Sequence, residues 1–215
     1  MLTPMRINRA DRYFPAALGQ FLGKHAPKSI RVLGDISILQ KPLFALFSSI
    51  RCPGDLILKT YDLARSLRDQ GVAVMGGFHS PIEQDVLQIL LKGKQPVVVC
   101  PARSIFKMIV PREWRGPMAE GRLTVLSFFG EGNERKTEAL AEKRNLCVAA
   151  LADKVIIAHA LPGSKTFSLA QQCLAWSKPT LTFSHPSNQA LLDLGAKPVD
   201  MGTFATKPWP TNPTV

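Results

Sequence analysis

Apolar runs alternate with amphipathic stretches along most of the chain, and this alternation predicts strands and helices in turn. Short, mostly apolar runs are typical of strands that are covered on both faces. These runs are Leu43–Phe47, Val72–Met75, Pro96–Cys100, Leu123–Phe128, Val155–Ala158 and Thr180–Phe183. Between them apolar side chains recur at helical spacing, as Leu56, Tyr61 and Leu67 do. Strands that alternate with helices indicate an α/β protein, a Rossmann-like three-layer sandwich with a mainly parallel sheet.

Local signals place some of the helices. Ser80-Pro81-Ile82-Glu83 combines an N-cap serine, a proline at the first helical position and a glutamate that completes a capping box. A helix therefore starts here. A long helix is predicted over residues 134–151, and residues 104–121, which include Trp114, are predicted to be irregular and basic.

The chain divides into three parts. Residues 1–41 are predicted to form an N-terminal lead-in that packs on the core, with a short helix ending near Gly23 and a strand over Ser29–Leu33. Residues 42–195 carry the regular alternation and form the Rossmann-like domain. Residues 196–215 are rich in proline and are expected to form a tail that lies along the surface or is disordered.

The composition is that of an ordinary globular protein. Hydrophobic residues make up 46% and charged residues 20% of the 215 residues. No apolar run approaches the roughly 20 residues that span a bilayer, so no membrane segment is expected. The N-terminus has no apolar signal region, and the four cysteines are scattered without a CxxC pair. We therefore expect free thiols and a cytoplasmic location.

The charge balance indicates which classes of partner the protein binds. Lys and Arg total 27 against 16 Asp and Glu, a formal net charge of +11. This excess favours a polyanionic partner or negatively charged small molecules.

The turn after the fifth buried strand carries the clearest chemistry. Leu161-Pro162-Gly163-Ser164-Lys165-Thr166 follows Val155–Ala158 and opens a helix. Backbone N–H groups, two hydroxyls and a lysine at a helix N-terminus suit an anion, most often a phosphate. Ligands of parallel sheets bind outside the carboxyl ends of the strands. The small or polar residues at these ends are Ser48, Ser49, Gly76, Gly77, His79, Arg103, His159, Gly163, Ser164 and Ser184, although turn chemistry alone also favours Gly and Ser there.

Several familiar motifs are absent from the chain. Gly163-Ser164-Lys165-Thr166 is not a Walker A motif, because no glycine precedes it at the required distance and Ser164 separates the glycine from the lysine. There is no GxGxxG fingerprint and no GxSxG elbow, and the histidines and cysteines lack the spacing of metal ligands. We expect no metal, no cofactor and no catalytic residue, and we lean toward a protein that is not an enzyme.

Taken together, several segments resemble the Rossmann-like core of the DNA-processing protein A (DprA/Smf) family. The segments that carry the resemblance are Tyr13–Leu18, Val32–Asp35, Phe44–Arg51, Val74–Glu83, Lys143-Arg144-Asn145 before Ala152–Ile157, and Gly163–Thr166. The chain departs from the family pattern at Ile50, Glu83, Leu87 and Leu146, where the family has Arg, Asp, His and Arg.

Members of that family bind single-stranded DNA, help to load a recombinase and pair as dimers. The resemblance therefore implies single-stranded DNA, a recombinase and a second copy of the chain as partners, with Arg51, Arg144 and Lys165 as phosphate contacts. The candidate site is then Ser48, Ser49, Arg51, Gly76, Gly77, His79, Ser80, Arg144, Asn145, Gly163, Ser164, Lys165 and Thr166.

A second family shares this core. Pro162-Gly163 and Thr166 resemble the motif of the LOG-type nucleotide phosphoribohydrolases, whose carboxylate has no counterpart between Phe167 and Leu192. Two hypotheses follow: a non-enzymatic, DNA-processing-like protein that binds single-stranded DNA in recombination or DNA uptake, or a nucleotide-binding sensor, carrier or LOG-type hydrolase that uses the same edge. The phenylalanines at 78, 128 and 129 are stacking candidates near this edge, or core residues.

Overall fold

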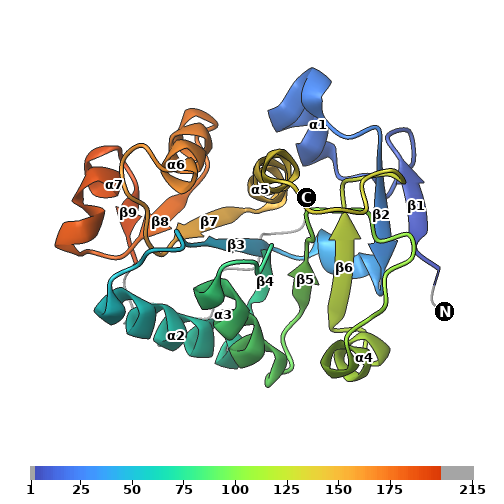
Figure 1. Cartoon of the computed structure of the whole chain (residues 1–215), viewed down its shortest axis with the longest axis horizontal. Coiled ribbons are helices and arrows are strands. Elements are labelled where there is room, and N and C mark those ends of the chain that lie inside the picture. Colours follow the sequence, from blue (N-terminus) through green and yellow to red (C-terminus); the bar gives the residue numbers. More distant parts are fainter. Residues whose placement is uncertain (1–2, 200–215) are drawn as a thin grey trace.

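The computed structural model describes residues 3–199 and is built on one nine-stranded sheet (Figure 1). The strand order is β1-β2-β6-β5-β4-β3-β7-β8-β9. β2 pairs antiparallel with both β1 and β6, and every other neighbouring pair is parallel. The strands are β1 Met5–Asn8, β2 Ser29–Leu33, β3 Leu43–Phe47, β4 Ala73–Gly76, β5 Val97–Val99, β6 Leu123–Ser127, β7 Lys154–Ile157, β8 Thr180–Thr182 and β9 Lys197–Pro198.

Helices cover both faces of this sheet and make three layers. One face carries α1, α5, α6 and α7, and the other carries α2, α3 and α4 (Figure 1). The helices are α1 Ala16–Leu22, α2 Gly54–Asp69, α3 Pro81–Leu91, α4 Arg112–Ala119, α5 Glu138–Leu151, α6 Lys165–Ala175 and α7 Gln189–Asp193, with short 3₁₀ turns at Gly23–His25, Ile36–Gln40 and Pro186–Asn188. The predicted Rossmann-like α/β fold is confirmed.

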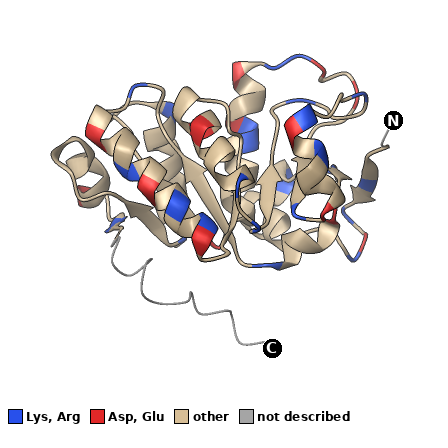
Figure 2. Cartoon of the chain, turned by 90° about the horizontal axis from the view of Figure 1, so that it is seen from below, with Lys and Arg blue, Asp and Glu red and all other residues tan. Residues whose placement is uncertain are grey.

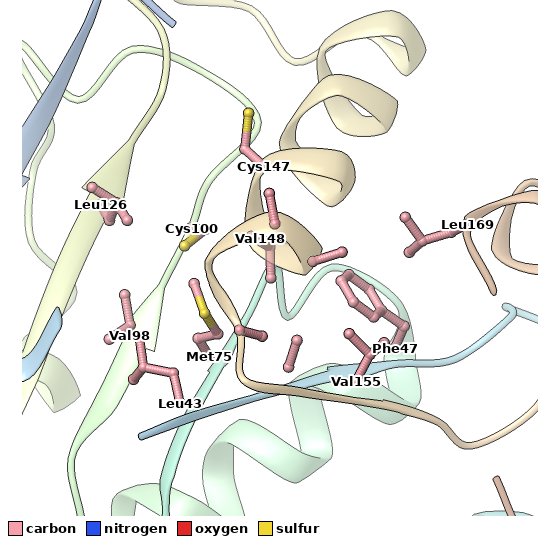
Figure 3. Close-up of a cluster of buried hydrophobic side chains, with 14 of the residues drawn as sticks. Leu43, Phe47, Met75, Val98, Cys100, Leu126, Cys147, Val148, Val155 and Leu169 are labelled. Carbon is pink, nitrogen blue, oxygen red and sulfur yellow. The ribbon is translucent and has the colours of Figure 1, made fainter. Parts of the chain in front are cut away.

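The core explains why the central strands are apolar throughout. All five residues of β3 are buried, because α5 packs on one side of it and α2 on the other. Figure 3 shows Val148 of α5 on the side of the helix that faces Met75 and Val155 of the sheet. Buried apolar surface of this kind supplies most of the stability of such a domain.

The order of the strands creates a topological switch point between β3 and β7. The chain leaves β3 toward α2 on one face and leaves β7 toward α6 on the opposite face. The two connections therefore diverge and leave a crevice outside the carboxyl ends of these two strands, where ligands of open α/β sheets bind.

The N-terminal and irregular segments differ in part from the prediction. β1 was not predicted, and together with β2 it extends the sheet while α1 packs on α5. The segment 104–121, expected to be irregular, contains α4, and α5 begins at Glu138 rather than at 134. Within residues 3–199 no helix is long and apolar enough to cross a membrane. β9 falls inside the predicted tail, and residues 200–215 of that tail lie outside the described part of the chain.

Candidate functional site

A cavity of about 360 Å³ opens at the switch point, and we call it the switch-point cavity. The loop after β3 and the turn after β7 form opposite walls, and α3 and α5 close the remaining sides. Its lining residues are Ser48, Ser49, Ile50, Arg51, His79, Ser80, Glu83, Ala141, Arg144, Asn145, Leu161, Ser164, Lys165 and Thr166. Five of these residues carry a hydroxyl group and three are Lys or Arg, while apolar atoms make up most of the exposed lining.

The buried Glu83 carboxylate organises one wall of this cavity. It accepts hydrogen bonds from the backbone N–H groups of Ser48 at 3.2 Å and His79 at 2.9 Å, and it completes the predicted capping box with Ser80. These bonds tie the end of β3 to the start of α3 and hold the wall in place. Next to Ser48, the Oγ atom of Ser49 is buried and has no hydrogen-bond partner within the described residues. A buried hydroxyl without a partner is costly, so this atom is suited to a ligand.

The turn after β7 forms the opposite wall. Gly163 has a φ of 78°, a left-handed conformation that glycine adopts without strain, and it directs the chain into α6. Ser164 caps α6, since its Oγ accepts from Phe167 N at 3.2 Å and its carbonyl accepts from Ser168 N at 3.0 Å. The backbone N–H groups of Lys165 and Thr166 donate to no acceptor among residues 3–199. Two N–H groups thus remain for an anion at the positive end of the helix.

The side chain of Lys165 is already paired. Its ammonium group forms ion pairs with Glu138 and Glu142, which lie one turn apart on α5. The hydrogen bond to Glu138 and, next in size of effect, the one to Glu142 raise the pKa of Lys165. The predicted lysine therefore lies at the site, with its charge balanced by two carboxylates that the sequence interpretation did not include.

Arg144 is buried at the boundary of this cavity. Its Nη1 donates to the carbonyl of Cys100 at 2.8 Å, and its Nε has no partner within residues 3–199. Burial lowers the pKa of the guanidinium group, and the nearby Glu83 carboxylate offsets part of that effect. Arg144 packs directly against the backbone of Gly77, where a side chain would overlap the guanidinium group. Arg144, expected from the family resemblance to contact phosphate, is therefore a buried residue rather than a solvated charge on the helix.

A larger cavity of about 720 Å³ adjoins the first, and we call it the Trp114 cavity. The two cavities share Ile50, His79, Ala141 and Arg144. The walls of the larger one combine apolar and aromatic residues with charged and amide ones; they include Phe78, Leu87, Val99, Met108, Ile109 and Trp114 together with Gln84, Gln88, Arg103, Glu113, Lys136 and Glu138. Phe78 has a φ of 46°, a conformation rare for a bulky residue, so the chain holds this wall at a local cost.

The structure brings most of the predicted residues together. All of them line the switch-point cavity except three glycines: Gly77 lines the Trp114 cavity, Gly76 is buried at the end of β4, and Gly163 is exposed in its turn. His159, noted at the end of a strand, is buried, and its Nδ1 lies 2.8 Å from Asn188 Oδ1. It is a structural residue.

Sequence reasoning missed Trp114, Glu138 and Glu142 as parts of the site. Trp114 lay in a segment predicted to be irregular, and a tryptophan among basic residues was the only signal there. The two glutamates are four residues apart and so share one face of a helix, but the sequence does not show which face meets α6.

The exposed face of α2 carries charges of both signs. In Figure 2 acidic and basic side chains alternate along α2, whose face carries Asp62 beside Arg65. Within the described residues no group of three or more His, Cys, Asp or Glu side chains could hold a metal ion.

The fold and the site together define a Rossmann-like α/β protein with a polar crevice at its switch point. Residues 6–201 match the model of the DNA recombination-mediator protein A family, and the chain belongs to this family. The resemblance seen in the sequence is thereby confirmed.

Solved structures agree on the fold. DNA processing protein A from Streptococcus pneumoniae matches with a TM-score of 0.78 and 18% identity, over 94% of this chain and 72% of its own. A second match is DNA processing protein A from Helicobacter pylori, described for its single-stranded DNA binding mode, with a TM-score of 0.74 and 19% identity over 95% and 94% of the two chains. A molybdenum cofactor binding protein from Rippkaea orientalis matches with a TM-score of 0.52 and 14% identity over 74% and 90%. A comparison with curated protein sequences finds no significant match.

Proposed function

We propose that the chain binds single-stranded DNA at the carboxyl edge of its sheet, with a phosphate in the switch-point cavity and bases against the Trp114 cavity. The observation that carries this proposal is the adjacency of the two cavities: hydroxyl-bearing and basic residues line the first, and Phe78 and Trp114 line the second among polar and apolar residues. A nucleic-acid strand has the same two chemistries along its length. Membership of a DNA-processing family and the single-stranded DNA binding of the Helicobacter pylori protein support it.

The switch-point cavity offers hydrogen-bond donors for a phosphate. The open amides of Lys165 and Thr166 and the unpartnered Oγ of Ser49 belong to residues that line one cavity. Arg51 is exposed at the rim of this cavity. Its guanidinium group forms no ion pair with a carboxylate of residues 3–199 and so adds a cation to the site. Sequence-independent phosphate contacts of this type supply most of the affinity of non-specific strand binding.

The part of the proposed site that would hold bases suits single-stranded DNA only. Trp114 is half-buried, and Ile50 and Ile109 at the rim are 76% and 79% exposed. Such side chains can stack on or pack against the faces of bases, which are accessible only when the bases are unpaired. Duplex DNA presents base edges in its grooves and hides these faces.

A small nucleotide is the second candidate ligand. The volume of the Trp114 cavity, about 720 Å³, falls within the range of small-molecule sites. The carboxylates around the switch-point cavity already serve other groups: Glu83 accepts from three backbone N–H groups, and Glu138 and Glu142 hold Lys165. This arrangement favours binding over hydrolysis of a glycosidic bond at that cavity, for which a free acid–base group is needed. The carboxylate of Glu113, in the lining of the Trp114 cavity, has no hydrogen-bond or ion-pair partner among residues 3–199.

The salt dependence of binding distinguishes the two ligands. With labelled oligothymidylate, affinity should fall steeply with salt, and Arg51→Gln should reduce the slope of log K against log [salt] by about 0.7. Trp114→Leu should weaken binding about tenfold, since stacking contributes roughly 1–3 kcal/mol per base. Lys92→Gln, an exposed charge at the amino edge of the sheet, is the matched control and should change neither value.

Either of two results would contradict the proposal. One is the absence of a shift of the oligonucleotide at low salt. The other is saturation by a nucleoside monophosphate with a shallow salt slope and release of free base, which would indicate the nucleotide hydrolase instead. A recombinase partner and self-association stay predictions from the family resemblance.

A further inference from the structure

The antiparallel strand β2 brings the N-terminal segment to the same edge as the site. In the β2–β6 pairing Arg31 lies opposite Ser127 and Leu33 opposite Val125, so the start of β2 lies beside the carboxyl end of β6. β1 is antiparallel to β2, and its last residue, Asn8, lies opposite Ser29. Residues 9–28, which connect the two strands, therefore begin and end at the carboxyl edge of the sheet.

Two arginines face each other on these strands. Arg6 of β1 and Arg31 of β2 are directly opposite in the register, so their side chains leave the same face of the sheet. Like charges in this position destabilise a strand pair. Arg31 has one carboxylate partner, Glu131 at 3.0 Å, and its Nε is buried without a hydrogen-bond partner in the described chain. The pair has an excess positive charge and an unused donor, which an anion would satisfy.

The surface between this pair and the proposed site is continuous. The Trp114 cavity shares Arg103 and Met108 with a third hollow of about 340 Å³. That hollow is lined by Phe106, over whose ring the Arg31 guanidinium lies at 5.6 Å from the centroid, and by Glu131, the partner of Arg31. Figure 1 shows the connection from β6 to α5 passing beside the ends of β1 and β2.

Basic residues predominate again beyond the arginine pair. Arg9, Arg12, Lys24 and Lys28 are all exposed, and we call them the N-terminal basic cluster. Arg9 N donates to the Lys28 carbonyl at 3.0 Å, so these two residues are adjacent. Asp11 is the one acidic residue between positions 3 and 28. The intervening hollow carries Glu131 and Glu134, which face Arg31 and Lys107 there.

The geometry points to an extended path for single-stranded DNA, from the switch-point cavity along the carboxyl edge to the N-terminal basic cluster. This inference rests on the proposed function and adds a second group of phosphate contacts to it. Five strand spacings separate β3 from β1, which at about 4.8 Å each correspond to about 24 Å. The phosphates of an extended single strand lie farther apart than the roughly 3.4 Å per nucleotide of duplex DNA, so fewer than about seven nucleotides cover this distance.

The length of the oligonucleotide tests the path. Fluorescence anisotropy is measured with labelled oligothymidylates of about 4 and about 16 nucleotides, since only the longer one reaches from the cavity to the cluster. The variant Arg9→Gln/Lys28→Gln should bind the longer strand roughly tenfold more weakly at 0.2 M salt and lower its salt slope by about 1.4, or about 0.7 for each lost contact. It should bind the shorter strand as the wild type does.

Lys92→Gln/Lys94→Gln is the matched control, because it removes two exposed lysines between α3 and β5 at the opposite edge of the sheet. The path is refuted if the Arg9/Lys28 variant and this control bind the longer strand equally, or if the variant loses affinity for both lengths alike. Wild-type protein that binds neither length refutes the proposed function and the path with it. Thermal unfolding of both variants verifies that they fold.

Discussion

A methyl group at Gly77 would lie 1.3 Å from Nη1 of Arg144. The backbone after β4 thus leaves room for a buried guanidinium group, which donates to the Cys100 carbonyl and forms the boundary between the two cavities. One glycine and one arginine, far apart in the sequence, together shape the candidate site.

We expect Gly77→Ala to destabilise the protein. The added methyl group must displace Arg144 from a buried position, which costs about 2–3 kcal/mol in the free energy of unfolding. Urea denaturation measures this change. Gly130→Ala is the control, because a methyl group there meets nothing within 4 Å, and it should change the stability by less than about 0.5 kcal/mol. Equal stabilities of the two variants would show that Arg144 moves aside freely.

Removing the carboxylates that hold Lys165 should strengthen DNA binding. In Glu138→Gln/Glu142→Gln the lysine keeps its charge and loses both ion pairs, so it is available to a phosphate. Affinity for oligothymidylate should rise about tenfold at low salt, and the salt slope should become steeper by about 0.7. Anisotropy titrations measure both. Glu120→Gln, whose carboxylate pairs with Arg122, is the control and should leave affinity unchanged. An unchanged affinity in the double variant would remove Lys165 from the site.

Two substitutions at position 164 distinguish the role of Ser164 in capping α6 from its role in binding DNA. Ser164→Ala removes the cap of α6 and should cost about 1 kcal/mol of stability. Ser164→Asp keeps the cap, since a carboxylate also accepts from the helix amides, but it places a negative charge in the cavity. The aspartate variant should therefore be as stable as the wild type and bind DNA at least several-fold more weakly. Full DNA affinity of a stable Ser164→Asp protein would argue against a phosphate at this turn.

The thiols should fall into two classes. Burial raises the pKa of all four thiols, that of Cys147 and of Cys173 to about 12, but Cys52 is only half-buried whereas the other three are buried and inaccessible to a reagent. Since the thiolate is the reactive form, one thiol should react with a disulfide reagent at about pH 8 and three should resist. All four should react after denaturation. More than one fast thiol in the folded protein would contradict the core described above.

Local patterns predicted the centre of the fold well. β2 and β3 have the predicted bounds. β3 is an uninterrupted apolar run, which is typical of a strand covered on both faces. α3 starts at Pro81 as the capping box indicated. β1 and α4 escaped prediction: β1 is four residues long and mostly exposed, and α4 contains Pro117, which normally ends a helix.

The site was predictable in outline and not in its charges. The strand ends converge because parallel strands end at one edge, so the sequence placed Ser49 and Ser164 near each other. The burial of Arg144 depends on Gly77, and the pairing of Lys165 depends on how α5 packs on α6. Contacts between elements far apart in the chain leave no pattern in the local sequence. These contacts decide which Lys and Arg side chains are available to a ligand.

The most direct test of the central claim is a crystal structure of the protein with a short oligothymidylate. We predict a phosphate within hydrogen-bonding distance of the Lys165 and Thr166 amides and Ser49 Oγ, and a base against Trp114. DNA bound elsewhere on the surface, with the switch-point cavity free of it, would contradict the account.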